Sequence, residues 1–231
     1  MVIHGLQKLT LLDYPGHTAC TVFTGSCPWR CPFCHNASLV LDPTSQPTIP
    51  EEEFFSFLAR RKGLLDGVAV TGGEPTLQKD LPAFLEKIRS LGFAVKLDTN
   101  GTNAAMLREI LENGLADYVA MDIKAGRSNY CAATGTLRPG LETVEESASF
   151  LMNGSTDFEF RTTVVRGLHS EEDFRDIAAW LAGDEKYFLQ CFKDSGDIIS
   201  GGCDAFTREE TEVFRQIVLP AIPNTEIRGM D

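Results

Sequence analysis

The sequence predicts an α/β fold in which parallel strands alternate with helices, as a doubly wound sheet or as a full or partial TIM-type barrel. Strand-like and helix-like segments alternate from one end of the chain to the other. Such alternation implies parallel strands joined by right-handed crossovers. No repeat, low-complexity tract or linker divides the 231 residues, a length that suits one large α/β domain or at most two small ones.

Seven segments have the short apolar, β-branched or aromatic composition that is typical of strands. They cover residues 19–25, 67–71, 94–99, 117–123, 158–165, 186–192 and 224–229, the last with the weakest pattern. In a doubly wound sheet and in a barrel alike, ligands bind at the carboxyl ends of parallel strands. The residues that follow these segments are therefore the first candidates for a functional site.

Six segments between the strands show helical periodicity with recognisable ends. They cover residues 51–63, 80–92, 104–114, 143–154, 170–183 and 207–218. Thr143 with Glu146, and Thr207 with Glu210, have the spacing of a capping box, in which two side chains satisfy free N–H groups of the first turn. Ser170 is the expected cap of the fifth helix.

Composition and charge exclude several classes of function. The 43% of apolar residues allow a full core, and the formal net charge of −12 argues against a nucleic-acid surface, which needs clustered Lys and Arg. No apolar run approaches the roughly 18–20 residues of a membrane span. The N-terminal segment lacks the basic flank and apolar stretch of a secretion signal. We therefore expect a cytoplasmic protein that binds neither nucleic acid nor membrane.

The seven cysteines do not form the pattern of a disulfide framework, because their number is odd and only three are clustered. Cys27, Cys31 and Cys34 lie in the loop 25–36, directly after the first predicted strand. Their spacing allows three thiolates to bind one metal centre. A [4Fe–4S] cluster normally takes four thiolates, so three would leave one iron free for another ligand. No role is assigned to the isolated cysteines, which are Cys20, Cys131, Cys191 and Cys203.

The cysteine loop by itself leaves two other interpretations open. A zinc site could be formed by the three cysteines and His35, although Cys₃His sets usually come as two separated pairs of ligands. A ferredoxin-like electron carrier would need a fourth local cysteine, which this loop lacks.

Polar residues stand at three further strand ends. Gly72, Gly73 and Glu74 follow the second predicted strand, where glycines allow a close backbone approach and the carboxylate offers a charged acceptor. The third strand ends in the run 96–101 (KLDTNG), which is also typical of a helix cap. The fourth strand ends in the run 120–124 (AMDIK), whose Asp and Lys could equally form an ion pair.

The pattern Cys-x₃-Cys-x₂-Cys, with Phe33 before the last cysteine and Gly-Gly-Glu one strand later, resembles the radical S-adenosylmethionine (SAM) superfamily. The resemblance implies a partial (β/α)6-type TIM barrel of the radical SAM kind, as a single domain over residues 1–231. It also implies that SAM chelates the free iron, that Phe33 packs against its adenine, and that Gly72, Gly73 and Glu74 receive its ammonium group. The cofactor would carry the difficult chemistry while the protein binds and orients it.

The segments Asp-Thr-Asn-Gly and Asp-x-Lys resemble those of glycyl-radical-enzyme activases. The resemblance implies that Asp98, Thr99 and Lys124 border the methionine part of SAM. It also implies that Asp98 and Asp122 hold a monovalent cation, for which hard oxygen ligands are suited. Arg161 matches an arginine that contacts SAM in these activases.

Two positions in this match have alternatives. Arg166 could serve in place of Arg161. Some activases carry a histidine near the SAM ribose, where this chain has Lys193, and Gln190 is the alternative residue for that contact.

The runs 5–8 (GLQK), 12–16 (LDYPG) and 34–36 (CHN) resemble the activating proteins of anaerobic ribonucleoside-triphosphate reductase. The resemblance implies an enzyme that cleaves SAM to a 5′-deoxyadenosyl radical and generates a glycyl radical on that reductase, with a flavodoxin- or ferredoxin-type electron donor. The alternatives are an activase of pyruvate formate-lyase or of another glycyl radical enzyme, a radical SAM enzyme acting on a small molecule, and a zinc-stabilised binding module without catalysis.

Overall fold

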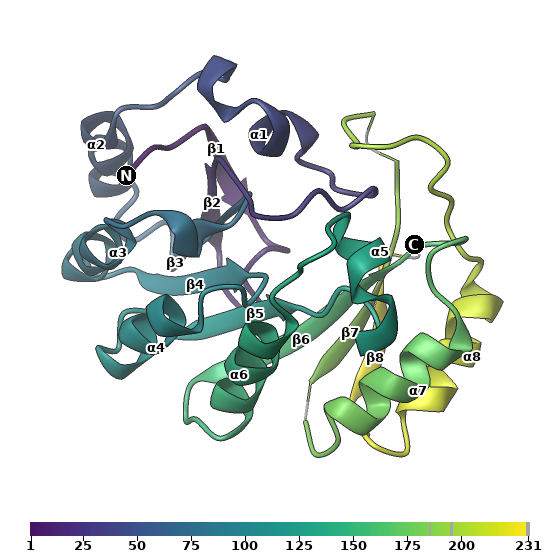
Figure 1. Ribbon diagram of the computed structural model, residues 1–231. Coiled ribbons are helices and arrows are strands. Elements are labelled where there is room, and N and C mark those ends of the chain that lie inside the picture. The colour runs from purple at the N-terminus through teal and green to yellow at the C-terminus, as the bar shows by residue number, and fades with distance from the viewer. Residues whose placement is uncertain (185, 195, 230–231) are drawn as a thin grey trace.

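A computed structural model describes residues 1–184, 186–194 and 196–229, so the last two residues of the predicted domain 1–231 lie outside the described residues. One sheet forms the centre of the described chain, and helices cover its outer side (Figure 1). Among the described residues, none of the helices combines the length and the apolar character that a membrane crossing requires.

The sheet has eight strands, which lie side by side in the order of the sequence. They are β1 (Gly5–Thr10), β2 (Ala19–Thr24), β3 (Gly67–Gly72), β4 (Ala94–Thr99), β5 (Tyr118–Asp122), β6 (Asp157–Val164), β7 (Tyr187–Cys191) and β8 (Thr225–Arg228). Strands β2 to β8 pair in parallel, as the alternation of segments predicted, and β1 pairs antiparallel with β2.

Helices follow each of the strands β2 to β7, which gives six β/α units before β8 among the described residues. The α-helices are α1 (Ala37–Leu41), α2 (Glu51–Arg60), α3 (Leu81–Ser90), α4 (Ala104–Glu112), α5 (Tyr130–Thr134), α6 (Leu141–Met152), α7 (Glu171–Trp180) and α8 (Arg208–Val218). Short 3₁₀ helices cover Pro43–Ser45, Pro75–Leu77 and Arg127–Asn129. Because β1 and β8 are both edges of the sheet, the barrel is open, which confirms the predicted partial (β/α)6-type architecture.

Helix caps explain where the longer helices begin. Thr207 and Glu210 form the predicted capping box of α8, with Thr207 N–H donating to Glu210 and Glu210 N–H donating to Thr207. Ser170 precedes α7, and its backbone N–H donates to the Asp173 carboxylate. The capping box predicted at Thr143 is wrong, because the turn at the left-handed Gly140 places the N-cap of α6 three residues earlier.

The two faces of the sheet differ in character. Val95 and Leu97 of β4 face outward and belong to the main apolar core between the sheet and its helices. The alternate residues, Lys96 and Asp98, face the interior of the open barrel, since successive side chains of a strand point to opposite faces. The interior of the barrel is therefore lined by charged groups.

Candidate SAM and cluster site

A cavity of about 210 Å³ lies at the carboxyl ends of the parallel strands. It brings together every residue predicted for the cluster, SAM or the cation, from segments up to 134 positions apart. These residues are Cys27, Cys31, Phe33, Cys34, Gly72, Gly73, Glu74, Asp98, Thr99, Asp122, Lys124 and Arg161. The predicted strand-end residues therefore share one cavity, and their roles toward ligands stay predictions.

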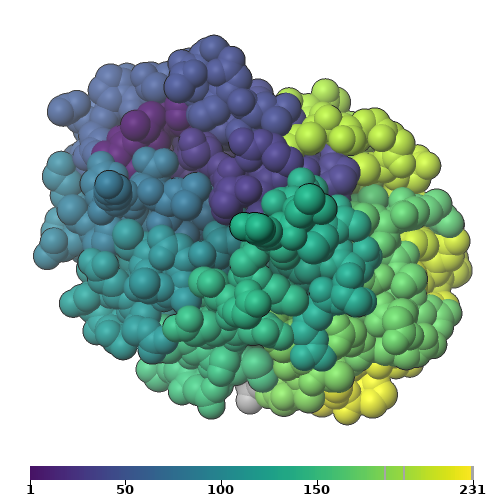
Figure 2. Space-filling view, viewed as in Figure 1, coloured from purple at the N-terminus to yellow at the C-terminus, as the bar shows by residue number. Residues whose placement is uncertain are grey.

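The cysteine loop is fixed by hydrogen bonds to two distant segments. The N–H of Arg30 donates to the carbonyl of Thr134 at 2.8 Å, and the indole N–H of Trp29 donates to the carbonyl of Pro139 at 3.1 Å. On the other side, the N–H of Ser200 donates to the carbonyl of Pro32 at 3.0 Å. Figure 2 shows these three segments meeting on one face of the molecule.

Gly72 and Gly73 let the end of β3 lie directly against the start of the cysteine loop. A Cβ on Gly73 would overlap the carbonyl oxygen of Ser26, and one on Gly72, whose φ is +122°, would overlap the backbone of Thr24. The amide side chain of Asn36 adds a hydrogen bond of 2.9 Å to the carbonyl of Gly72. The two glycines are therefore required by contacts within the protein, whatever ligand they also receive.

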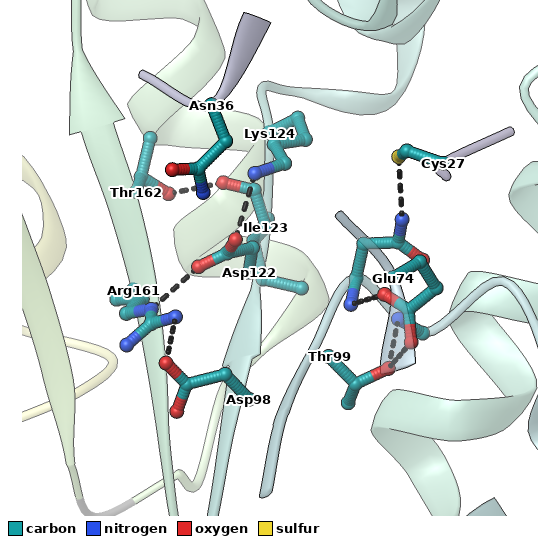
Figure 3. A network of polar contacts seen from close by, with 12 residues as sticks. Cys27, Asn36, Glu74, Asp98, Thr99, Asp122, Ile123, Lys124, Arg161 and Thr162 are labelled. Atoms are coloured by element: carbon teal, nitrogen blue, oxygen red, sulfur yellow. Dashed lines mark hydrogen bonds and ion pairs between the residues drawn. The ribbon is translucent and has the colours of Figure 1, made fainter. Parts of the chain in front are cut away.

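Glu74 connects the ends of β3 and β4. Its side chain has no exposed surface, and its carboxylate accepts four hydrogen bonds, of which the one from Thr99 can be followed in Figure 3. The donors are the N–H and hydroxyl of Thr76 at 3.1 and 2.6 Å, the hydroxyl of Thr99 at 2.8 Å, and the N–H of Asn100 at 2.7 Å. Complete burial raises the pKa of Glu74, although these hydrogen bonds oppose the shift. If the SAM ammonium binds Glu74 as predicted, it must use a carboxylate that already holds the ends of β3 and β4 together.

The three loop cysteines are free thiols in the described structure. Burial raises the pKa of Cys27 to about 12 and that of Cys31 to about 11, and the nearby Lys124 ammonium opposes the shift at Cys31. The side-chain amide of Asn100 donates to the sulfur of Cys27 at 3.6 Å. Because iron binds thiolates, loading a cluster here must release the protons of these buried thiols.

The donor set fits a cluster held by three cysteines. Cys27, Cys31 and Cys34 line one cavity, with the amide of Asn100 and the ammonium of Lys124 placed to stabilise negative sulfur. Among the described residues, no three His, Cys, Asp or Glu side chains form a group that could hold a single metal ion. A cubane cluster places each thiolate on a different iron, so its ligands need not surround one point.

Five charged side chains form a chain of ion pairs beside the thiols. Lys96 pairs with Asp98. Arg161 bridges Asp98 at 3.1 Å and Asp122 at 2.5 Å, and it lies between the two carboxylates in Figure 3. Lys124 completes the chain at 2.7 Å from Asp122. Burial alone would raise the pKa values of both carboxyls, but Arg161 with Lys96 lowers that of Asp98, and Arg161 with Lys124 holds that of Asp122 well below its usual range.

The predicted monovalent cation between Asp98 and Asp122 does not fit this arrangement. Each carboxylate already pairs with two cationic side chains, and Arg161 lies between them. A further cation would meet positive charge instead of free carboxylate oxygens.

The structure separates the alternative residues at two predicted contacts. Arg161 lines the cavity, whereas Arg166 pairs with Glu210 away from it. Gln190 also lines the cavity, whereas Lys193 lines a different hollow. Arg161 and Gln190 are therefore the residues that can reach a ligand in the cavity. The remaining cysteines are not among the lining residues of the described cavity; they are Cys20, Cys131, Cys191 and Cys203.

His169 is a residue that the sequence did not indicate; it does not line the cavity, but it contacts Phe33, which does. Its Nδ1 accepts the N–H of Val165 at 3.0 Å, so Nε2 carries the proton that it donates to the carbonyl of Lys124 at 2.8 Å. The ring lies edge-on to Phe33, with centroids 6.2 Å apart. Burial lowers the pKa of His169 and keeps the ring neutral. No local motif surrounds this histidine, and only the fold brings it to Phe33.

Comparison with known proteins places these features in a family. The family model described as the radical SAM superfamily matches residues 21–181. The chain is 33% identical over 205 residues to a Methanocaldococcus jannaschii protein whose name assigns it to the glycyl-radical enzyme activating enzymes, covering 85% of this chain and 82% of that protein. It is 31% identical over 146 residues to the pyruvate formate-lyase-activating enzyme of Clostridium pasteurianum, covering 61% of this chain and 60% of that enzyme.

Solved structures agree on the fold. Streptococcus suis SuiB bound to S-adenosylmethionine matches with a TM-score of 0.68 at 14% identity, covering 89% of this chain and 49% of SuiB.

The family model and the relative from Methanocaldococcus jannaschii show that the chain belongs to the radical SAM superfamily, whose members use a [4Fe–4S] cluster and SAM, and within it to the glycyl-radical-enzyme activating type.

Proposed function

We propose that this protein activates a glycyl radical enzyme, with anaerobic ribonucleoside-triphosphate reductase as the partner. Cys27, Cys31 and Cys34 hold the cluster, and SAM occupies the cavity beside it. When bound, the cluster supplies the electron that cleaves SAM to methionine and a 5′-deoxyadenosyl radical, which takes a hydrogen atom from a glycine Cα of the partner. A flavodoxin- or ferredoxin-type protein is the proposed electron donor, and residues 1–231 form one radical SAM domain.

The observation that carries this proposal is the shared cavity of three free thiols and cationic side chains at the carboxyl ends of the strands. In a barrel of parallel strands this end binds the ligands. Lys124 and Arg161 line the cavity and offer donors to the carboxylate of SAM. Phe33, which lies edge-on to His169, offers an aromatic surface to the adenine. Backbone groups of Gly72 and Gly73, with Asp98, Thr99 and Glu74, border the amino acid part of SAM.

The partner is proposed from the sequence. The runs 5–8 and 12–16 resemble activating proteins of anaerobic ribonucleoside-triphosphate reductase. The relative from Methanocaldococcus jannaschii is named for the same class of activity without naming a partner. A protein that must act on a glycine of another chain needs an open approach to its radical, and the open barrel is compatible with such an approach.

Electron paramagnetic resonance tests this function directly. The anaerobically reconstituted and reduced protein is incubated with SAM and anaerobic ribonucleoside-triphosphate reductase, and in parallel with pyruvate formate-lyase. We expect the glycyl doublet with the reductase. A doublet only with pyruvate formate-lyase would move the assignment to that partner, and deoxyadenosine release that needs a metabolite and no partner protein would refute the activase assignment.

Two cysteine variants provide a matched pair for this assay. Cys31→Ala removes a predicted cluster ligand, and Cys203→Ala removes a partly buried cysteine that does not line the described cavity. We expect Cys31→Ala to lose SAM cleavage and Cys203→Ala to keep it. Equal loss in both variants would show that the ligands are misassigned.

A further inference from the structure

Lys96 is the most deeply buried cationic side chain of the ion-pair chain in the barrel interior, with 2% of its surface exposed. It lies two residues before Asp98 on β4, so both side chains point to the same face of the sheet. Its ammonium group pairs with Asp98, which lines the cavity, whereas Lys96 itself is not among the lining residues. A lysine is rarely buried to this extent unless a carboxylate neutralises it, so the pair is a built feature of the interior.

The charges around Asp98 and Asp122 are balanced by the protein itself. Lys96 and Arg161 both contact Asp98, and the Arg161 guanidinium reaches across to Asp122 on the next strand. The strand register supports this bridge, because Asp122 and Arg161 are directly paired on β5 and β6. Three cationic side chains thus surround two carboxylates, once Lys124 is included.

We propose that the Lys96 ammonium takes the place of the monovalent cation that the resemblance to activases predicted at Asp98 and Asp122. Lys96 is then a positioning residue, which holds the Asp98 carboxylate in place. Because Arg161 bridges Asp98 and Asp122, Lys96 also keeps the charged side chains of the SAM site in their arrangement, without Na⁺ or K⁺. The inference rests on the proposed binding of SAM in this cavity. It predicts that SAM binding by this chain is independent of alkali cations.

Exchange of the alkali cation in the unmodified protein is the first test. The dissociation constant of SAM is measured by equilibrium dialysis on the reconstituted protein in KCl, NaCl and choline chloride of equal ionic strength. The melting temperature of the cluster-free protein is measured in the same salts. We expect dissociation constants within about twofold of one another and equal melting temperatures. A dissociation constant about tenfold larger in choline, or a melting temperature raised specifically by K⁺ or Na⁺, would overturn the inference.

Replacement of Lys96 is the second test. Lys96→Met keeps the length of the side chain and removes the charge, so Asp98 is left with only the shared Arg161. We expect the dissociation constant of SAM to rise about tenfold in choline chloride and to recover in KCl, with a K⁺-dependent melting temperature that the wild type lacks. Lys96→Arg should behave as the wild type. The matched control is Lys87→Met, which removes an exposed lysine of α3.

The outcomes separate this inference from the proposed function. A Lys96→Met variant that binds SAM as the wild type does in choline, or that K⁺ does not rescue, refutes the role of Lys96. If Lys96→Met does not fold, the salt exchange on the unmodified protein decides. A wild-type protein that binds no SAM in any salt refutes the proposed function, and its melting temperatures in the three salts still test whether an alkali cation binds.

Discussion

Replacing Glu74 with glutamine changes one buried acceptor into a donor at the junction of β3 and β4. In the native protein the two carboxylate oxygens accept four hydrogen bonds from Thr76, Thr99 and Asn100. Glutamine can keep the three bonds at one oxygen, but its NH₂ group then faces the N–H of Asn100. Losing one hydrogen bond to a charged acceptor and leaving a buried donor unpaired costs about 2–3 kcal/mol.

Thermal unfolding of the cluster-free protein under anaerobic conditions measures this cost. For a chain of this size about 1 kcal/mol lowers the melting temperature by about 2–4 °C, so Glu74→Gln should lower it by about 4–12 °C. Glu86→Gln on the exposed face of α3 is the control and should change the free energy of unfolding by less than about 0.5 kcal/mol.

The same variant distinguishes two roles of Glu74. If the carboxylate holds the strand ends, stability falls with or without ligand. If Glu74→Gln is as stable as the wild type and only the affinity for SAM is lost, the carboxylate serves the ligand and the reasoning from its four hydrogen bonds is refuted.

Three further predictions concern two residues that line the cavity and His169, which contacts its lining residue Phe33. Burial lowers the pKa of His169 from its ordinary 6.5, so below pH 6.5 this histidine binds a proton in the unfolded chain but not in the native protein. The free energy of unfolding therefore falls as the pH drops below 6.5, by up to about 1.4 kcal/mol per pH unit. His169→Gln should lack this slope in denaturant titrations between pH 7.5 and 5.5, and equal slopes would contradict the assignment. Gly73→Ala should lower the free energy of unfolding by about 3 kcal/mol or more and reduce iron content, because the added methyl overlaps backbone; a fully loaded, stable variant would contradict that contact. Gln190→Ala should weaken SAM binding about tenfold in equilibrium dialysis while Lys193→Ala does not, and the reverse result would show that the ribose contact is misplaced.

Strands β2 to β5 were predictable because most of their residues are buried, so they stand out as apolar runs, whereas β8, with one fully buried residue, gave the weakest pattern. Strand β1 was missed, since it lies at the edge of the sheet and exposes Gln7, Lys8 and Leu9, which leaves no apolar run to recognise. The capping box at Thr143 was wrong for a local reason, because Gly140 turns the chain into the helix earlier than the Thr–Glu spacing implies.

The cavity was predictable to the extent that its residues lie next to one another in the sequence. The cysteine loop and the Gly-Gly-Glu turn carry short-range patterns, and the order of parallel strands brings them together. His169 and Asn100 contribute through partners 45 and 73 positions away, so no local pattern could have identified their contacts. Lys96 stood within a recognised segment, but only the structure pairs it with Asp98 and so alters the interpretation of the predicted cation site.

Anaerobic reconstitution with iron and sulfide, followed by electron paramagnetic resonance of the reduced protein with and without SAM, tests the three-thiolate site most directly. About four iron atoms per chain and a cluster spectrum that changes when SAM is added are the expected results. A colourless protein with one zinc per chain, or a cluster whose spectrum ignores SAM, would contradict the assignment of Cys27, Cys31 and Cys34.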